Sequence, residues 1–495
     1  MSDSPPRRSP EAGSPLSSTR LSWGVLLGLA VASRIAYHAA GVRFFAGSLD
    51  AYIQYVDTDL LRTRLLESLF YLHDQPPAFN LFLGVVLKLF PAGHDTVFHA
   101  AFLVGGLALA AAMFTLLLRL HLPRWLALGL ALLASSNPTT VLYENWLLYE
   151  HPVAVLLCLS LLFLHRFADH GRRLDGLLFF SFGALVCFTR GTFHVVWLGG
   201  VLIATLVLLP ARRRAALLCA AGPLALVLAL YLKNLVLFGS FGTGAVYAKL
   251  NFAQMTTFRL PMKVRRERVA KSELSPLALT PYLHATTTPI HKRYVRRTRS
   301  TGIPILDRTV RYRGGMSLHS LALLEIADVY LRDARSVHRR DPRIYWSEVR
   351  QNLREYTLPA CETLMLHCCV GSKKKGASPP SLQPYFAPLC GPKEWRRANP
   401  MLGGLFVVLI GFGAVAFLGS WWAGARTEAV TFAFIGLTIL WVTVPGILLS
   451  HGDQNRYRTE VGPLFWALGS LLIWAAYRHA MSLFRRIRRM LLRHP

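Results

Sequence analysis

The stretch LESLFYLHDQPPAFNLFLGVVLKLF, residues 66–90, decides the membrane topology of this chain. Its second half, residues 76–90, is apolar but about 15 residues long, whereas a helix needs about 20 to span a bilayer. Counting this segment as a full span would move every later loop to the opposite side of the membrane. We therefore predict a re-entrant or interfacial helix here, because short loops rich in Lys and Arg then face the cytoplasm.

The composition predicts a membrane protein that crosses the bilayer many times. The chain has 495 residues, of which 53% are hydrophobic and 16% are charged, and its mean hydropathy is +0.37. A soluble domain carries about 25% charged residues. These figures exclude a disordered, collagen-like or small disulfide-rich chain. The apolar residues predict ten transmembrane helices, at residues 21–41, 97–118, 124–141, 152–167, 174–190, 193–210, 214–234, 401–423, 429–450 and 457–477.

The charge of the chain is strongly basic. There are 55 Lys and Arg against 26 Asp and Glu, a formal net charge of +29. The chain shows no basic module interleaved with aromatic residues, so we expect no nucleic-acid partner. In a membrane protein such charge marks cytoplasmic loops and surfaces that meet anionic lipids. The loops at residues 119–124, 166–173, 212–214 and 485–493 are predicted to be cytoplasmic.

The predicted spans divide the chain into five parts. They are a disordered cytoplasmic tail (1–20), a seven-span module (21–234) with a first outer loop (42–75), a large outer loop (235–400), C-terminal helices (401–480) and a basic cytoplasmic tail (481–495). The large outer loop is predicted to hold amphipathic helices at residues 320–337 and 345–356. In an oxidising compartment its cysteines could form one or two disulfides, and their pairing is left open (Cys361, Cys368, Cys369 and Cys390).

Acidic residues are scarce and gather at the predicted outer face. The first outer loop holds Asp50, Asp57, Asp59, Glu67 and Asp74; the second holds Glu144 and Glu150; and Asp453 precedes Arg456 and Arg458. Each could be a solvated loop residue, but ionisable groups beside apolar spans usually line a site. As a set, they indicate a functional site at this membrane face.

The residue types in this set suit group transfer to a hydroxyl. A carboxylate can act as general base on an acceptor hydroxyl, and Asp50, Asp57 and Glu144 are the candidates. Carboxylates of two loops, Asp50 and Glu144, could share a divalent metal ion such as Mg²⁺ or Mn²⁺; a metal-free site is the alternative. Arginine suits a phosphate, and Arg456 and Arg458 lie at headgroup level. The pattern favours sugar transfer from a lipid phosphate.

Four ordered motifs resemble those of the GT-C superfamily, which are integral membrane glycosyltransferases that include protein O-mannosyltransferases and lipid A aminoarabinose transferases. The first is the His-Asp-Gln-Pro-Pro element at residues 73–77. The others are SNPTTVLYENWLLYEHP (136–152), KNLVLFGSFGTGAVYAKLN (233–251) and DQNRYRTEVGPLFW (453–466). The superfamily usually has an Asp-Glu pair about 25 residues before the Pro pair. Here Asp50 fits that spacing but is followed by Ala51, and Asp57 and Asp59 are rivals.

The resemblance implies a fold, a reaction and further site residues. It implies a seven-span module and inverting transfer of a sugar from a polyprenyl-phosphate donor to a glycan, lipid or protein acceptor. From the Arg- and Ala-rich composition, the expected location is a bacterial inner membrane with the site facing the periplasm; an endoplasmic reticulum enzyme with its site in the lumen is the alternative. Glu144 fits the second acid position slightly better than Glu150. Substrate contacts are expected from His73, Gln75, Arg190, Asn251, Arg456 and Arg458. A transporter or flippase of lipid-linked precursors and a non-catalytic scaffold are the alternative functions.

Overall fold

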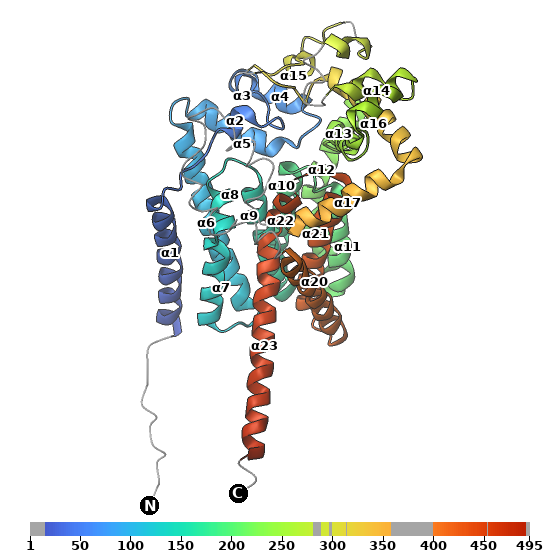
Figure 1. Cartoon of the computed structure of the whole chain (residues 1–495). Coiled ribbons are helices and arrows are strands. Elements are labelled where there is room, and N and C mark those ends of the chain that lie inside the picture. Colours follow the sequence, from blue (N-terminus) through green and yellow to red (C-terminus); the bar gives the residue numbers. More distant parts are fainter. Residues whose placement is uncertain are drawn as a thin grey trace, which may run out of the picture.

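The computed structural model describes residues 15–280, 289–296, 299–312, 314–357, 399–452 and 454–491. Throughout these ranges the secondary structure is helical, and only two isolated β-bridges occur, Phe45–Trp146 and Val310–Met316. The prediction of an all-α protein is confirmed. The helices form two layers (Figure 1): a membrane layer of long apolar helices and, above it in that view, an upper layer of short helices.

In the described ranges, five helices are long and apolar enough to cross a membrane: α6 (His94–Arg119), α9 (Glu150–His170), α12 (Arg213–Phe238), α20 (Asn399–Trp422) and α21 (Arg426–Leu449). Two bent pairs raise the number to seven if each is one span. They are α7 (Arg124–Ser136) with α8 (Pro138–Glu144), bent by 52°, and α22 (Gln454–Glu460) with α23 (Gly462–Leu491), bent by 68°.

Each of the ten predicted spans coincides with a helix, but the count of ten spans is not confirmed. The other three are α1 (Pro15–Ala39), α10 (Arg173–Thr189) and α11 (Val195–Leu208). At about 1.5 Å per residue, the 14 residues of α11 are about 21 Å long, short of the roughly 30 Å hydrocarbon core. The segment after the Pro pair forms α5 (Pro77–Leu89), which lies in the upper layer (Figure 1) and is not a full span.

Helix α9 is the centre of the membrane layer. In its most apolar part 72% of residues are buried inside the protein, against 6% for α20, which lies at the periphery. Hydrogen bonds between helices add to apolar packing: Nδ1 of His165 lies 3.0 Å from Oγ1 of Thr431 on α21. Such contacts matter here because lipid tails are as apolar as the helix surfaces, so burial alone favours association weakly.

The upper layer consists of two groups of short helices. The first outer loop supplies α2 (Ser48–Ala51), α3 (Thr58–Thr63) and α4 (Leu65–Tyr71). The large outer loop supplies α13 (Ala245–Met255), α14 (Met262–Ala270), α15 (Pro304–Asp307), α16 (Leu321–Arg340) and α17 (Pro342–Thr357). Short 3₁₀ turns complete the layers at Pro210–Arg212, Thr257–Arg259, Pro276–Leu279 and Pro289–Arg293.

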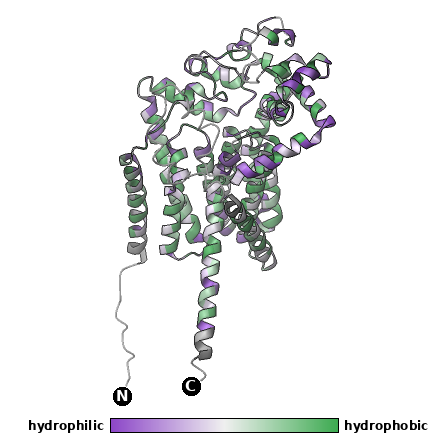
Figure 2. Ribbon diagram, in the orientation of Figure 1, coloured by the Kyte–Doolittle hydropathy of each residue, from purple (hydrophilic) through white to green (hydrophobic). Residues whose placement is uncertain are grey.

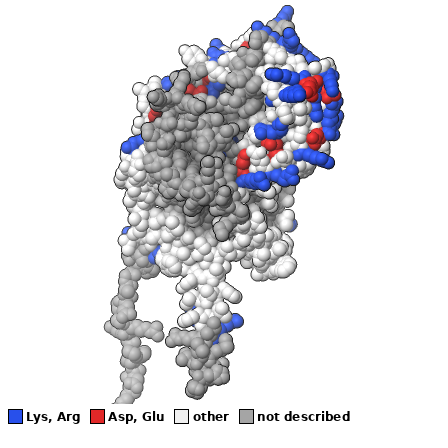
Figure 3. Space-filling view, viewed as in Figure 1, with Lys and Arg blue, Asp and Glu red and all other residues white. Residues whose placement is uncertain are grey.

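The two predicted amphipathic helices of the outer loop are confirmed as α16 and α17. Helix α16 buries residues at helical spacing, among them Leu323, Ile326, Tyr330, Ala334 and Val337. Hydrophobic residues dominate the membrane layer (Figure 2), whereas on the face seen in Figure 3 charged side chains gather over the upper layer. This difference in polarity agrees with a protein whose membrane layer lies in the bilayer and whose upper layer lies outside it.

The ends of the chain differ in part from the prediction. Helix α1 begins at Pro15, so residues 15–20 of the predicted disordered tail are helical. Helix α23 continues to Leu491 through most of the predicted basic tail. The first 14 residues, Asp453 and the four loop cysteines fall outside the described residues. The cysteines of the spans, Cys158, Cys187 and Cys219, are buried and free, in accord with their apolar reading.

The break between α7 and α8 follows from the pair Asn137-Pro138. A residue before proline is disfavoured in helical conformation, and Asn137 is extended, with φ −65° and ψ 149°. Its side chain caps the new helix by accepting a hydrogen bond from the amide of Thr140 at 3.1 Å. Its amide group also donates to the carbonyl of Ala134 at 2.7 Å. This residue therefore closes one helix and starts the next.

Replacing Asn137 tests this account of the helix break. We expect Asn137→Ala to lower the free energy of unfolding by about 1 kcal/mol, because the cap of α8 is lost. Asn137→Ser, which keeps a capping oxygen, should retain most of that stability. Unfolding of the purified protein in mixed micelles of increasing SDS content measures the difference. Equal loss in both variants would contradict the role of the cap.

Candidate active site at the upper end of the spans

Four charged residues meet where the membrane layer joins the upper layer. Arg456 on α22 pairs with Glu150 at the start of α9, with Nε and Oε1 3.2 Å apart. Arg190, after α10, pairs with Glu460 of α22, with Nε and Oε1 2.8 Å apart. We call these residues the buried ion-pair cluster; each side chain is at most 5% exposed. Two positive and two negative charges make the cluster neutral, as burial demands.

Tyrosine rings enclose the buried ion-pair cluster. The guanidinium carbon of Arg190 lies 4.3 Å from the ring centre of Tyr149 and 5.0 Å from that of Tyr457. Nη1 of Arg456 donates to the hydroxyl of Tyr52 at 3.3 Å. That hydroxyl lies 2.5 Å from the hydroxyl of Tyr149, which donates to Oε1 of Gln54. These contacts stabilise the two cations beyond their ion pairs and join the first outer loop to α22.

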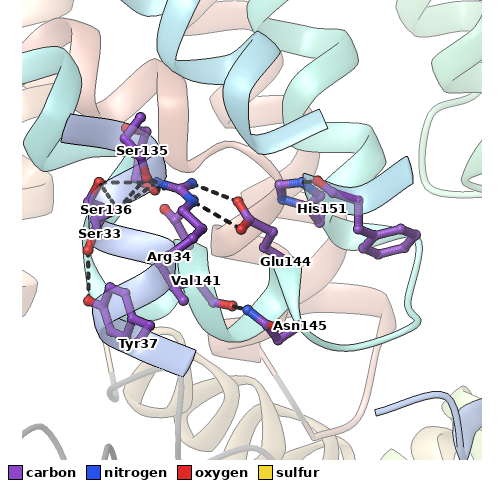
Figure 4. Close-up of polar contacts among 12 residues, drawn as sticks. Ser33, Arg34, Tyr37, Ser135, Ser136, Val141, Glu144, Asn145 and His151 are labelled. Carbon is purple, nitrogen blue, oxygen red and sulfur yellow. Dashed lines mark hydrogen bonds and ion pairs between the residues drawn. The ribbon is translucent and has the colours of Figure 1, made fainter. Parts of the chain in front are cut away.

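A second buried ion pair joins α1 to α8 (Figure 4). Nη2 of Arg34 lies 2.6 Å from Oε2 of Glu144, and Nε of Arg34 donates to Oε1 at 3.0 Å. The guanidinium also donates to the hydroxyl of Ser136 at 3.1 Å and to the carbonyl of Ser135 at 2.9 Å. The hydroxyl of Tyr37 donates to the carbonyl of Ser136 at 2.7 Å. A two-bond pairing of this kind is strong and directional.

Two neighbouring glycines of α6 make room for this pair. A Cβ added to Gly106 would lie 1.8 Å from Oε2 of Glu144, and one added to Gly105 would lie 3.2 Å from Nε2 of His151. The ring of His151 is buried, with Nε2 3.1 Å from the carbonyl of Phe102. The small residues therefore let α8 and the start of α9 approach α6 closely.

The carboxylates of the first outer loop occupy different environments. Asp57 is buried and pairs with Arg311 at 3.1 Å and with Arg308 at 3.5 Å. Asp59 also contacts Arg308, at 3.5 Å. Asp50 is half-buried on α2 and accepts a hydrogen bond from Oγ1 of Thr58 at 3.3 Å. Of the three candidate bases Asp50, Asp57 and Glu144, Asp50 is thus the most exposed to solvent.

The His-Asp-Gln-Pro-Pro element links the first outer loop to α13. Nε2 of His73 lies 2.9 Å from the carbonyl of His319, and burial lowers the pKa of His73 to about 4. Oδ1 of Asp74 accepts hydrogen bonds from the amides of Val246 at 2.8 Å and Tyr247 at 3.3 Å, at the start of α13. Burial raises the pKa of Asp74 to about 8 despite these two bonds.

The remaining predicted contacts of this region are also buried. Gln75 follows Asp74 and is 8% exposed, and Asn251 on α13 is 5% exposed. Both side chains are thus largely shielded from solvent. Neither side chain lines the apolar cavity that lies among the spans beside α22. Their predicted role in substrate binding stays a prediction.

A cavity of about 520 Å³ opens among the spans beside α22. Its walls are mostly apolar and come from α6, α7, α8, α9, α20, α22 and α23, with Leu109, Phe406, Leu409 and Trp466 among the lining residues. Arg458 lies at the wall formed by α22. Its guanidinium carbon lies 4.6 Å from the ring centre of Phe406, and Nη1 donates to the carbonyl of Tyr356 on α17. The cavity combines an apolar groove with one cation.

The structure brings together only some of the residues that the sequence singled out. Arg456, Arg190 and Glu150 meet, whereas Glu144 lies with Arg34 and Asp57 lies with Arg311. Arg456, expected to contact phosphate, is 3% exposed and held by Glu150; Arg458 is the arginine that lines the cavity. The sequence interpretation missed Glu460 and Tyr149. Glu460 carried a signal, because it follows Arg456 by four residues.

The residues present do not fit a shared metal ion. Within the described part of the chain, no three His, Cys, Asp or Glu side chains are grouped to hold a metal. The predicted ligands Asp50 and Glu144 belong to separate polar networks, since Glu144 is bound at both oxygens by Arg34. A divalent cation on Glu144 would have to displace this guanidinium. We therefore derive no step through a metal ion.

Breaking the Arg34–Glu144 pair should be costly. Arg34→Ala leaves a buried carboxylate without its partner, so we expect a loss of about 3–5 kcal/mol in stability. The double variant Arg34→Met/Glu144→Leu removes both charges and should recover much of this loss. Arg64→Ala, which breaks an exposed pair with Glu67, should cost less than about 1 kcal/mol. Unfolding in SDS mixed micelles tests all three, and a double variant as unstable as Arg34→Ala would contradict the pairing.

Asp74 should make stability depend on pH. Because its folded pKa is raised, its contribution is fully present below its unfolded pKa of about 4 and is lost as pH rises toward about 8. Asp74→Asn should remove a decline of up to about 1.4 kcal/mol per pH unit across this window. Asp95→Asn, at a side chain that is 65% exposed, is the control. Thermal unfolding between pH 5 and 8 measures the slopes; unchanged slopes in Asp74→Asn would refute the assignment.

Two crystal structures of ArnT from Cupriavidus metallidurans, one bound to undecaprenyl phosphate and one in the apo state, are similar to this chain at 15% sequence identity. The matches cover 91% and 90% of this chain and 78% of the ArnT chain, with a TM-score of 0.34 for each. No protein-family model and no curated protein matches the sequence. At this identity and TM-score the likeness assigns no residue and no activity.

Proposed function

We propose that this protein is a GT-C-type membrane glycosyltransferase that takes a sugar from a polyprenyl-phosphate donor. One observation carries the proposal: an apolar cavity among the spans ends at a cation, Arg458, beside the buried ion-pair cluster. A polyprenyl phosphate has the matching structure, with a long apolar chain joined to an anionic head. Ligand sites of this kind are mostly apolar with few convergent polar groups.

Arg458 is the proposed phosphate contact. A guanidinium in a poorly hydrated site binds a phosphate by charge-assisted hydrogen bonds. Arg458 is positioned by Tyr356 of α17 and by the ring of Phe406, so both layers contribute to its place. Arg456 and Arg190, held by Glu150 and Glu460, act as positioning residues that keep α22 against α9 and α10. This arrangement supports a cation fixed before the donor arrives.

Asp50 is the proposed general base. It is half-buried in the first outer loop, whereas the rivals Asp57 and Glu144 are buried in pairs with arginines. Such pairs occupy the carboxylate oxygens and so block their approach to a substrate. In the proposed reaction, Asp50 takes the proton of the acceptor hydroxyl, whose oxygen attacks the anomeric carbon. The carbon–phosphate oxygen bond breaks, polyprenyl phosphate leaves on Arg458, and the configuration inverts.

The same geometry supports a proposal for the side of the membrane on which the reaction takes place. The loop that holds Asp50 and the residues around Arg458 lie at the junction with the upper layer, and the proposed reaction takes place there. Basic short loops lie at the opposite ends of the spans, as expected for the cytoplasmic side. We therefore propose a bacterial inner-membrane enzyme whose site faces the periplasm. The acceptor is a hydroxyl-bearing glycan, lipid or protein.

The test is release of polyprenyl phosphate by purified protein supplied with polyprenyl-phosphate sugars and mixed acceptors. We expect Asp50→Asn to lower kcat about 100-fold or more, because a general base contributes roughly that factor. Arg458→Gln should raise KM for the donor about tenfold, as expected when a hydrogen bond to a charged group is lost. The exposed residues Asp95 and Arg64 supply the controls Asp95→Asn and Arg64→Gln.

The outcomes separate this proposal from its rivals. Activity that Asp50→Asn retains, but Asp57→Asn or Glu144→Gln loses with the fold intact, would move the base. Movement of the labelled donor across a liposome bilayer without release of polyprenyl phosphate would indicate a transporter or flippase. Neither turnover nor movement, with every donor tried, would leave a non-catalytic scaffold as the better description.

A further inference from the structure

A second cavity, of about 310 Å³, lies between α1 and α6 and has no role in the proposed reaction. Val31 and Ile35 of α1 and Leu103 and Leu107 of α6 form its apolar walls. Val31 and Ile35 are 44% and 64% exposed, so this side of α1 faces the surroundings of the membrane layer. A molecule that fills the cavity therefore enters sideways from the hydrocarbon of the bilayer.

The separation of α1 from α6 at this level has a structural cause. Below the cavity α1 packs directly on the bundle, where Leu26 and Ala30 are fully buried. Above that point the contacts of α1 are polar and directed at α7 and α8, through Arg34 and Tyr37 (Figure 4). The side chains of α1 and α6 therefore leave a space between the two helices at this level, and this space is the cavity. An apolar chain is the occupant that such walls accept.

The side chain of Arg43 is hydrogen-bonded at the outer mouth of the cavity. Arg43 is exposed, and its Nη1 donates to the carbonyls of His38, at 2.5 Å, and Val42, at 2.9 Å. Both His38 and Val42 line the cavity, so these bonds hold the guanidinium at its rim. His99, also in the lining, is stacked on Phe44 with ring centres 5.1 Å apart. Glu144, the nearby carboxylate, is already bound by Arg34.

The length of the cavity suits one lipid chain below a headgroup. His38 follows Val31 by seven positions on α1, so the two residues lie about 10 Å apart along the helix axis. His38, Val42 and Arg43 follow at the outer end of the span, where lipid headgroups lie. The order from apolar walls to a fixed cation is the order of an anionic phospholipid from its chain to its phosphate. Each cation near the surface adds about 1 kcal/mol of attraction to anionic lipid.

We propose that this cavity is a binding site for one anionic phospholipid of the outer leaflet, with an acyl chain between α1 and α6 and its phosphate on Arg43. The chain would cover the remaining exposed part of Arg34, whose side chain is 10% exposed, and so keep water from the Arg34–Glu144 pair. Bound lipid thereby stabilises the attachment of α1 to α8. The site is separate from the cavity at Arg458 and stands whether or not the protein transfers sugar.

The test is native mass spectrometry of the purified full chain exchanged into nanodiscs of equal parts phosphatidylglycerol and phosphatidylcholine. We expect one phosphatidylglycerol to remain bound to the wild type after release. Leu103→Trp fills the cavity and should abolish this retention. Val104→Trp places the same side chain on the neighbouring, 65% exposed position of α6 and should leave it unchanged.

A second variant tests the headgroup without disturbing the core. Arg43→Gln, at an exposed position, should lower retention of phosphatidylglycerol relative to phosphatidylcholine about fivefold, as expected for about 1 kcal/mol. Arg64→Gln, at another exposed arginine, should not change the ratio. Lipid retained equally by Leu103→Trp and Val104→Trp would overturn the site. A wild type that holds both lipids equally would overturn the assigned headgroup.

Discussion

A charge can be buried in the apolar layer of this protein only beside an opposite charge, and the architecture of the whole molecule depends on this constraint. Arg34 and Glu144 hold α1 against the broken span α7–α8, and Arg456 with Glu150 and Arg190 with Glu460 hold α22 against α9 and α10. Lipid offers little driving force for helix association, so these contacts specify which helices are neighbours. They also explain why the polar residues of the sequence are so few and so clustered.

The two broken spans bring polar residues together at the candidate site. A continuous helix presents its polar groups along one line, but α8 and α22 bend by 52° and 68° relative to their partners. The bends bring the starts and ends of several helices to one level, where backbone and side-chain polar groups face one another. The apolar cavity lies directly beneath, with Arg458 in its wall. Broken helices at membrane depth are tolerated where they line such a cavity.

Much of the fold was predictable because periodicity and hydropathy act locally. Every predicted span is helical, although two of them are broken by a bend, and the segment after Pro76 and Pro77 is a short helix and not a full span. The candidate site was predictable only in part. Burial makes pairing obligatory but does not name the partner, so Glu144 was considered as a base or metal ligand although Arg34 binds it. Glu460 follows Arg456 by four residues, a spacing that suggests a partner on the same helix and not Arg190, with which it pairs.

By itself, the sequence determined that this is an all-α membrane protein, because apolar runs are properties of short segments. Tertiary structure alone decided which arginine meets which carboxylate. Arg34 and Glu144 are 110 residues apart, and Arg456 and Glu150 are separated by most of the chain. Such pairings depend on how the helices pack, and glycines such as Gly106 permit the approach through space that no local pattern records.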